Sequence, residues 1–292
     1  MLLAIAYLLL GGNGDSRSIS PQLFIEDKWW SYDPVPLEFS VEARPDLGVC
    51  PSDMLPISGG MLDDGGQLSW QTTSVEALQK TTCTSWIEKK FPERCSSFDR
   101  GAWLKLSQKF PRRSMSFCID RYEWPNRKGT YPWVMVTYPE AGELCGRVGK
   151  RLCTEDEWTF ACEGEEGTPY PYGYDRRSEE CGVDKPWRKY SQSALADRGS
   201  QRCSKELERL WQGSRSGERP TCASSFGVED MNGSVDEWST RTRVGEWESI
   251  LKGGYWGPVR TRCRPSTRNH APGHVFYQQG FRCCSDLKRT NI

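Results

Sequence analysis

The sequence predicts a loop-rich fold that mixes short helices with strands. Composition leads there: the 292 residues include 13 Trp, 28 Gly and 18 Pro, the mean hydropathy is −0.69, and 36% of the residues are hydrophobic. Gly and Pro interrupt regular elements, and large aromatic side chains can fill a core without long aliphatic helices. The length suits one large or two small globular domains.

Strand and helix signals occur in the middle of the chain. Residues 117–124 and 133–138 alternate or run apolar, as strands do. A helix is expected over 139–148, because Pro139 suits a first turn and Gly149 would end it. A second helix is expected from Thr154, whose hydroxyl would form a capping box with Glu157. This helix would place Trp158, Ala161 and Cys162 on one face.

The 13 cysteines indicate disulfides and an oxidising compartment. Zinc spacings are missing, since no C-x2-C occurs and the only histidines are His270 and His274. An odd count leaves at least one free or intermolecular thiol. We therefore expect an extracytoplasmic protein, whether periplasmic, secreted or at the cell surface.

The N-terminus supports export only in part. Leu2 to Leu10 is apolar, too short to span a bilayer and close to a signal-peptide core, but it lacks a basic n-region and a clear cleavage site. The alternative is a mis-called start codon before an intracellular protein. We assign 1–14 as a leader and 15–49 as a linker, with a globular segment from Cys50 and no stable membrane span.

Charge gives no reason to expect a nucleic-acid partner. Lys+Arg and Asp+Glu are equal at 39 each. Arg260, Arg262 and Arg264 alternate and would share one face of an extended segment, which could form an anion patch. The zero net charge and the expected export make a nucleic-acid site the weaker interpretation.

Seven motifs, in order, resemble the formylglycine-generating enzyme, or sulfatase-modifying factor, family. They are CPSDMLPISGG (50–60), FCIDRYEW (117–124), GKRLCTEDEWTFACEG (149–164), YPYG (170–173), SSFGVEDMNGSVDEW (224–238), LKGGYWG (251–257) and GFRCC (280–284). The resemblance implies one mixed α+β domain over 50–286, related to C-type lectins and low in regular secondary structure, with 287–292 as a tail.

The catalytic cysteine pair of that family is not preserved. The resemblance implies oxidation of a substrate cysteine to formylglycine, using O2 and copper held by two thiolates, because soft sulfur ligands select Cu(I). The family pattern G-G-S-x-x-C-x-x-x-x-C reads GGYWGPVRTRC here. Tyr255 stands at the serine and Pro258 at the first cysteine. Cys263 falls at the second cysteine without a gap, or beyond it when Arg264 and Arg268 anchor the alignment.

Ordinary formylglycine generation is therefore not expected, and Cys263 is only a weak catalytic candidate. The leading hypothesis is a non-catalytic domain that binds a peptide, glycan or protein partner in the former substrate groove. The alternatives are an oxidoreductase with altered metal or thiol chemistry, and a structural envelope protein. Residues expected to line the groove are Tyr255, Trp256, Arg260, Arg264 and Arg268.

Copper and iron are not expected as cofactors. Iron-dependent relatives take their ligands largely from an added helical domain that this chain lacks. His270 and His274 have helical i,i+4 spacing, but Pro272 and Gly273 between them argue for a loop. A two-histidine site in that loop remains open, with a solvent-facing pair as the alternative.

A calcium site is expected from the resemblance. The family turn N-x-x-G-N-A-W-E-W binds Ca²⁺ through side-chain and backbone oxygens, and this chain reads DMNGSVDEW. The ligands would be the carboxylates of Asp230 and Glu237 and the carbonyl oxygens of Gly233 and Val235, donors that suit Ca²⁺. The alternative is that the two carboxylates only cap the turn.

The resemblance also implies a disulfide between Cys162, at the end of the second predicted helix, and Cys283 in G-F-R-C. A further family cysteine near the glycine-rich loop corresponds to Pro265 here. Cys263 lies two residues away, so we expect it to have taken over a structural disulfide and to be oxidised.

Overall fold

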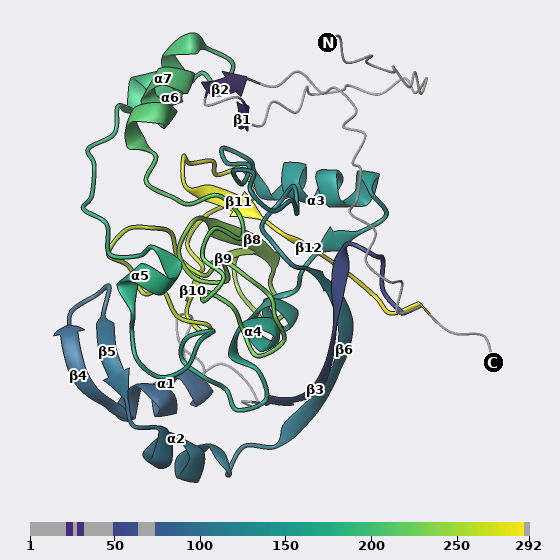
Figure 1. The fold of residues 1–292 in the computed structure, drawn as a ribbon, viewed down its shortest axis with the longest axis vertical. Coiled ribbons are helices and arrows are strands. Elements are labelled where there is room, and N and C mark those ends of the chain that lie inside the picture. Colours follow the sequence, from purple (N-terminus) through teal and green to yellow (C-terminus); the bar gives the residue numbers. More distant parts are fainter. Residues whose placement is uncertain (1–21, 26–27, 32–48, 64–73, 289–292) are drawn as a thin grey trace.

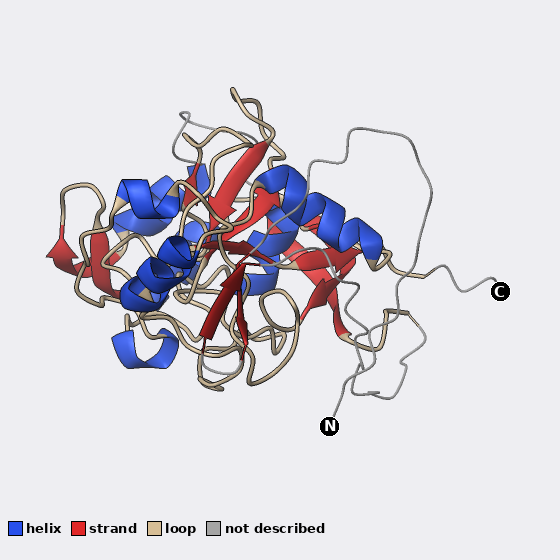
Figure 2. Cartoon of the chain, turned by 90° about the horizontal axis from the view of Figure 1, so that it is seen from above, coloured by secondary structure: helices blue, strands red, loops and turns tan. Residues whose placement is uncertain are grey.

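The computed structural model describes residues 22–25, 28–31, 49–63 and 74–288. Its strands are β1 (Gln22–Ile25), β2 (Lys28–Ser31), β3 (Met54–Leu62), β4 (Cys83–Glu88), β5 (Arg94–Phe98), β6 (Arg112–Asp120), β7 (Arg151–Leu152), β8 (Asp236–Thr240), β9 (Ser249–Lys252), β10 (Ser266–Thr267), β11 (Gln279–Phe281) and β12 (Cys283–Ser285). Its helices are α1 (Ser74–Thr81), α2 (Arg100–Ser107), α3 (Tyr138–Arg147), α4 (Glu155–Glu163), α5 (Ser178–Cys181), α6 (Gln192–Leu195) and α7 (Gln201–Leu210). Long loops connect them (Figure 2), so the predicted mixed α+β fold with little regular structure is confirmed.

Two four-stranded sheets organise the molecule. Their strand orders are β3-β6-β12-β7 and β10-β9-β8-β11. β3 and β6 form an antiparallel ribbon from Met54 opposite Asp120 to Leu62 opposite Arg112, and it curves along one side of the molecule (Figure 1). α4 contacts β6 of the first sheet and β8 and β9 of the second. This helix therefore joins the two sheets.

Large aromatic side chains fill the core, as the composition predicts. Trp158 and Phe160 of α4 pack with Phe117 and Ile119 of β6 in one buried cluster. A second buried cluster lies between α3 and the second sheet, and its aromatic members are Trp124, Trp133, Trp238 and Phe281. Burial of such side chains stabilises a fold that has few long helices.

Both predicted helices form where their capping residues place them. The Thr154 hydroxyl accepts a hydrogen bond from the backbone of Glu157, and the Glu157 carboxylate accepts one from the Thr154 backbone at 2.8 Å. α3 begins one residue before Pro139 and ends one residue before the predicted limit, with Gly149 at φ 71° just beyond. Thr137 and Glu140 form its capping box, which the sequence analysis did not identify.

One predicted strand is wrong and another is shortened. Residues 117–120 belong to β6, but residues 121–124 form a turn. Residues 133–138 do not form a strand: Met135 has φ 60°, which interrupts an extended backbone, and Thr137 already caps α3. The apolar side chains of Trp133 to Val136 are nevertheless buried, so the hydrophobic run marked the core and not a strand.

The predicted leader, residues 1–14, lies outside the described residues. Of the predicted linker, 15–49, the structure describes β1, β2 and Val49; β1 and β2 form an antiparallel pair, and β2 contacts α7. In the described part of the chain, no helix combines the length and the apolar character needed to cross a membrane. α6 and α7 lie at one end of the molecule, and α2 with the β4–β5 hairpin lies at the other (Figure 1).

Candidate functional site

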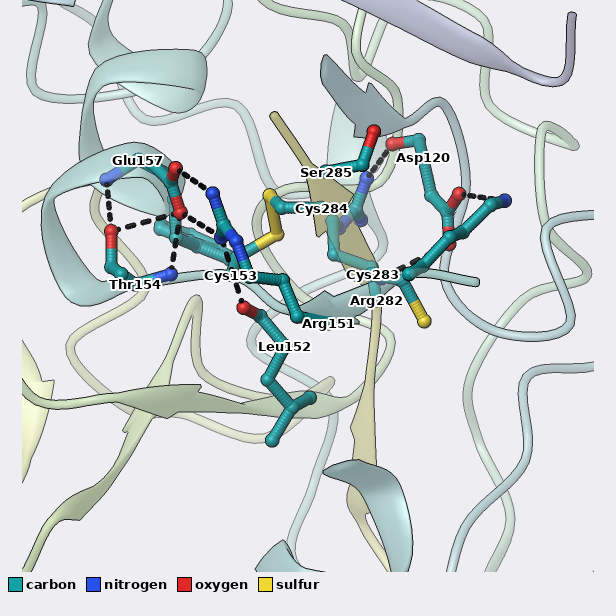
Figure 3. The surroundings of a disulfide bond; sticks show 12 residues. Asp120, Arg151, Leu152, Cys153, Thr154, Glu157, Arg282, Cys283, Cys284 and Ser285 are labelled. Atoms are coloured by element: carbon teal, nitrogen blue, oxygen red, sulfur yellow. Dashed lines mark hydrogen bonds and ion pairs between the residues drawn. A yellow bond between two sulfur atoms is a disulfide. The ribbon is translucent and has the colours of Figure 1, made fainter. Parts of the chain in front are cut away.

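Cys263 is fully buried and forms a disulfide with Cys162, near the end of α4. Its expected oxidation is confirmed, but the predicted Cys162–Cys283 bridge is wrong, because Cys283 bonds to Cys145 of α3. Neighbouring strand residues point to opposite faces. Cys283 therefore faces α3, while Cys284 faces the other way and bonds to Cys153 (Figure 3).

No pair of free thiols exists in the protein. All 13 cysteines lie in the described residues, and 12 of them form six disulfides, the others being Cys50–Cys118, Cys83–Cys95 and Cys181–Cys222. The remaining thiol, Cys203, is buried in α7, and burial raises its pKa to about 11, with Asp197 adding to the rise. A raised pKa disfavours the thiolate that binds copper or attacks a substrate.

Residues 253–263, here called the glycine-rich loop, form the segment that the resemblance aligns with the family's catalytic cysteines. Gly253 has φ 87°, and a Cβ atom there would lie 2.8 Å from the Met231 carbonyl oxygen, so the turn requires glycine. The backbone of Cys263 donates to the Pro169 carbonyl at 2.9 Å, and Trp256 packs edge-on against Trp211. The loop is therefore closed against the core.

Buried ion pairs hold the chain that follows this loop. Arg264 donates two hydrogen bonds to the Glu163 carboxylate at 2.7 and 2.6 Å, and Arg268 donates to Glu155 at 2.7 Å. Both arginines are buried, and both glutamates lie on α4. The planar guanidinium suits such paired contacts.

These positions correct the predicted groove lining. Trp256, Arg264 and Arg268 are buried and line no exposed surface, because the arginines pair with α4 carboxylates and the indole fills the core under α7. Tyr255 and Arg260 are half-buried. The expected alternation of the arginines on an extended segment is also wrong, since residues 260–264 form no strand.

An exposed aromatic side chain covers part of the glycine-rich loop. Phe91, between β4 and β5, is 70% exposed, and the Arg260 guanidinium lies 4.8 Å from its ring centroid. The Cys83–Cys95 disulfide ties the two strands of this hairpin. Sequence reasoning missed Phe91, because K-K-F-P-E only indicates a turn and does not show what the turn contacts.

The turn predicted to bind calcium has both carboxylates buried. One oxygen of Asp230 accepts a hydrogen bond from the Gly217 backbone at 2.7 Å. Both oxygens of Glu237 accept from Arg282 at 2.7 Å, and one also accepts from the Trp158 indole at 2.8 Å. Glu237 is thus committed to a cation of the protein itself.

Gly233 and Val235, the predicted carbonyl donors, are buried on the same turn. The Glu123 carboxylate accepts from the Val235 backbone at 3.1 Å; burial raises its pKa, and the charge of Asp230 adds to that rise. Within the described ranges, no group of three or more His, Cys, Asp or Glu side chains is arranged to hold a metal ion. Calcium binding here would require Glu237 to exchange partners, and it stays a prediction.

His270 and His274 lie in a loop, as predicted, and stack with ring centroids 4.0 Å apart and planes at 14°. Burial lowers the pKa of His270 to about 4, and the neighbouring imidazole adds to the drop. Nitrogen lone pairs lie in the ring planes, so two nearly parallel rings do not direct them at one ion. Both rings are half-buried, which differs from the expected solvent-facing pair.

The comparison with protein families agrees with the motif order. A family model described as "Sulfatase-modifying factor enzyme 1-like domain" matches residues 62–287, which is most of the chain. The chain belongs to this family. The observed mixed fold is consistent with that membership. The predicted domain bounds of 50–286 stay a prediction.

Two curated relatives are similar to about half of this chain. "Inactive C-alpha-formylglycine-generating enzyme 2" of Mus musculus is 30% identical over 172 residues, which cover 54% of this chain and 50% of the relative. The Bos taurus protein of the same name is 28% identical over 173 residues, covering 54% of this chain and 52% of the relative. The chain thus spans about half the length of the curated relatives it matches.

Solved structures with partial similarity were also found. A structure titled "Crystal Structure of CarF" has a TM-score of 0.41 and 13% identity, with 60% of this chain and 88% of that chain covered. PvdO from Pseudomonas aeruginosa has a TM-score of 0.40 and 18% identity, with 61% and 84% covered.

Proposed function

We propose that this family member is not a formylglycine generator and that it binds a peptide, glycan or protein partner on the surface above the glycine-rich loop. The single observation that carries the proposal is the Cys162–Cys263 disulfide. It consumes the only cysteine of the loop, while Pro258 stands at the position of the other. Copper coordination by two thiolates therefore has no ligands in this loop.

The curated relatives carry the word "inactive" in their names, which supports the same interpretation for this chain. Loss of chemistry leaves a folded surface available for recognition. Phe91 is an exposed aromatic side chain stacked on Arg260, a combination that is frequent where proteins bind partners, because aromatic and guanidinium groups contribute much contact energy. We place the partner against these two residues.

An extracytoplasmic location fits the six disulfides, which form and persist in oxidising environments. In the reducing cytosol these bridges would be lost, and the chain would carry 13 free thiols. The proposed partner is therefore one that the protein meets outside the cytoplasm.

The catalytic part of the proposal is tested by counting thiols and metals. Protein made in an oxidising compartment should show one thiol per chain after denaturation, none in a Cys203→Ser variant, and no bound copper. It should not consume O2 with a cysteine-containing peptide. Two additional thiols with stoichiometric copper would contradict the proposal and support an oxidoreductase.

The binding part is tested by substitution at the hairpin tip. A partner captured by the parent protein should be lost by Phe91→Ala combined with Arg260→Gln. It should be retained by Val244→Ala, which truncates a 96% exposed apolar side chain in the β8–β9 loop. Retention of the partner by both the double variant and the control would rule out the proposed surface, and the absence of any partner would favour a structural envelope role.

A further inference from the structure

A second surface feature lies on α7, away from the hairpin tip. An open pocket of about 460 Å³ lies against this helix, and its charged lining residues are Arg202, Lys205, Glu206 and Arg209. The opposite face of α7 carries Cys203, Leu207 and Leu210, which pack in a core cluster with Trp256. The pocket is therefore on the outer side of the helix, and its role is independent of the proposed function above the glycine-rich loop.

The cations of the pocket share one face of the helix. Residues 202, 205 and 209 are spaced by three and four positions, which places neighbouring side chains above one another. At a rise of 1.5 Å per residue, they extend over about 10 Å. All three side chains are exposed. The pocket thus offers an elongated row of positive charge and not a single point.

Only part of this charge is neutralised within the protein. Glu206, the one carboxylate among the described lining residues, accepts two hydrogen bonds from Arg209 at 2.9 and 2.6 Å and one from the Ser191 backbone at 2.7 Å. Arg202 donates to the Ser193 hydroxyl at 2.8 Å. Among the described residues, neither Arg202 nor Lys205 has a carboxylate at ion-pair distance. Within the part of the chain that the structure describes, two positive charges of the row thus have no carboxylate partner.

An exposed indole lies on the segment that runs beside the C-terminal end of α7. Tyr190 precedes Ser191 at the pocket edge, and Trp187 lies edge-on to Tyr190 with ring centroids 6.3 Å apart. Trp187 is 56% exposed, and Arg188 donates to the Arg209 carbonyl at 2.7 Å, which fixes this segment beside the end of α7. An exposed indole offers an apolar face on which the C–H groups of a sugar ring can pack.

We propose that the α7 pocket binds an acidic oligosaccharide that carries sulfate or carboxylate groups. Guanidinium and ammonium groups pair with such anions, the row matches a ligand longer than one sugar, and the indole supplies the apolar contact. A free inorganic anion would use only the cations. An acidic peptide would leave the indole without its sugar-ring contact.

The experiment measures affinity of the full chain for a heparin-derived sulfated tetrasaccharide by calorimetry at low salt. Arg202→Gln combined with Lys205→Gln should weaken binding at least tenfold. The matched control, Lys105→Gln with Lys109→Gln, removes two exposed cations near α2 at the other end of the molecule and should change affinity less than twofold. Added salt should weaken the parent's binding, since exposed charges are screened.

Two further arms separate the sources of binding. Trp187→Ala should weaken the tetrasaccharide severalfold without changing the affinity for inorganic sulfate. Bound tetrasaccharide should also protect Lys205, and not Lys105, from acetylation, a readout that needs no variant. The proposal is overturned if both double variants lose affinity equally, if sulfate or a poly-glutamate peptide binds as tightly as the tetrasaccharide, or if Lys205 stays unprotected.

Discussion

Asp120 shows how this protein tolerates charge in its core. Its side chain is fully buried and accepts hydrogen bonds from the Lys150 ammonium at 2.7 Å and from the Cys283 backbone at 3.0 Å (Figure 3 shows Asp120 beside Cys283). Burial raises the pKa of Asp120 to about 6, although Lys150 acts in the opposite direction. Desolvation outweighs the ion pair here.

The raised pKa of Asp120 predicts a pH dependence of stability. Between about pH 4 and pH 6 the folded state retains a proton that the unfolded state releases, so this group's contribution to stability falls as the pH rises through that window. Asp120→Asn should reduce the slope of unfolding free energy against pH there. Denaturant unfolding at pH 4, 5, 6 and 7 measures it. Glu143→Gln, an exposed carboxylate on α3, is the control, and equal slopes in both variants would contradict the assignment.

Calcium at the Asp230 turn remains a proposal with a direct test. If Ca²⁺ binds the folded state, a chelator should lower the melting temperature by mass action, and Asp230→Ala should remove this sensitivity. In the structure Arg282 occupies the Glu237 carboxylate, and the ion would have to displace it. If neither chelator nor added Ca²⁺ changes the melting temperature of the parent protein, the calcium proposal is wrong. Arg282 is then the counter-ion of Glu237.

α4 is the element on which the fold depends most. Each of its nine residues is buried, it contacts both sheets, and it provides Glu155 and Glu163 for two buried arginines and Cys162 for a disulfide. A helix with no solvent face gains little from surface pairs, so its start depends on the Thr154 cap.

Removal of that cap should therefore destabilise the protein. Thr154→Ala is expected to cost about 1 kcal/mol of unfolding free energy, because the hydroxyl no longer satisfies a first-turn N–H group. Thr242→Ala, which truncates an exposed hydroxyl, should stay within about 0.5 kcal/mol. Denaturant titration compares the two, and an undiminished Thr154→Ala stability would show that Glu157 alone defines the helix start.

Features that depend on neighbouring residues were predicted better than features that depend on residues far apart in the sequence. The Thr154 and Glu157 pattern located α4, since a capping box depends on residues three positions apart. The strand predicted at 133–138 failed because hydrophobicity reports burial and not backbone conformation, and Met135 adopts φ 60°. The buried roles of Arg264 and Arg268 depend on glutamates about a hundred positions away, which the residues around them do not reveal.

At the scale of the whole molecule, disulfides supply part of the stability that a loop-rich core does not provide. The Cys162–Cys263 bridge joins residues 101 positions apart, although Cys153–Cys284 already brings their neighbourhoods together. The pairing itself could not be predicted from the cysteine positions, since adjacent half-cystines at 283 and 284 serve opposite faces of one strand.

Loss of this bridge should lower stability without creating a copper site. Cys162→Ser combined with Cys263→Ser should cost roughly 2–4 kcal/mol, toward the lower end because the other bridges already restrict the unfolded chain. Cys162→Ser alone frees one buried thiol and should bind no Cu(I), as no second thiol lies in the loop. Unfolding and metal titration measure both, and tight copper binding by the single variant would contradict the expectation.

The positions of the two cysteines of β12 also determine when their disulfides can form during synthesis of the protein. Their bridges reach back 138 and 131 positions, so neither can close until nearly the whole domain has emerged from the ribosome, whereas Cys83 and Cys95 can pair early. Cys145 and Cys153 must wait as thiols, each facing a choice between two adjacent partners. A one-residue slip of β12 would exchange those partners. The register of β12 at the moment of oxidation therefore decides which disulfide isomer forms. A wrong isomer can be corrected only if an isomerase rearranges the bridges.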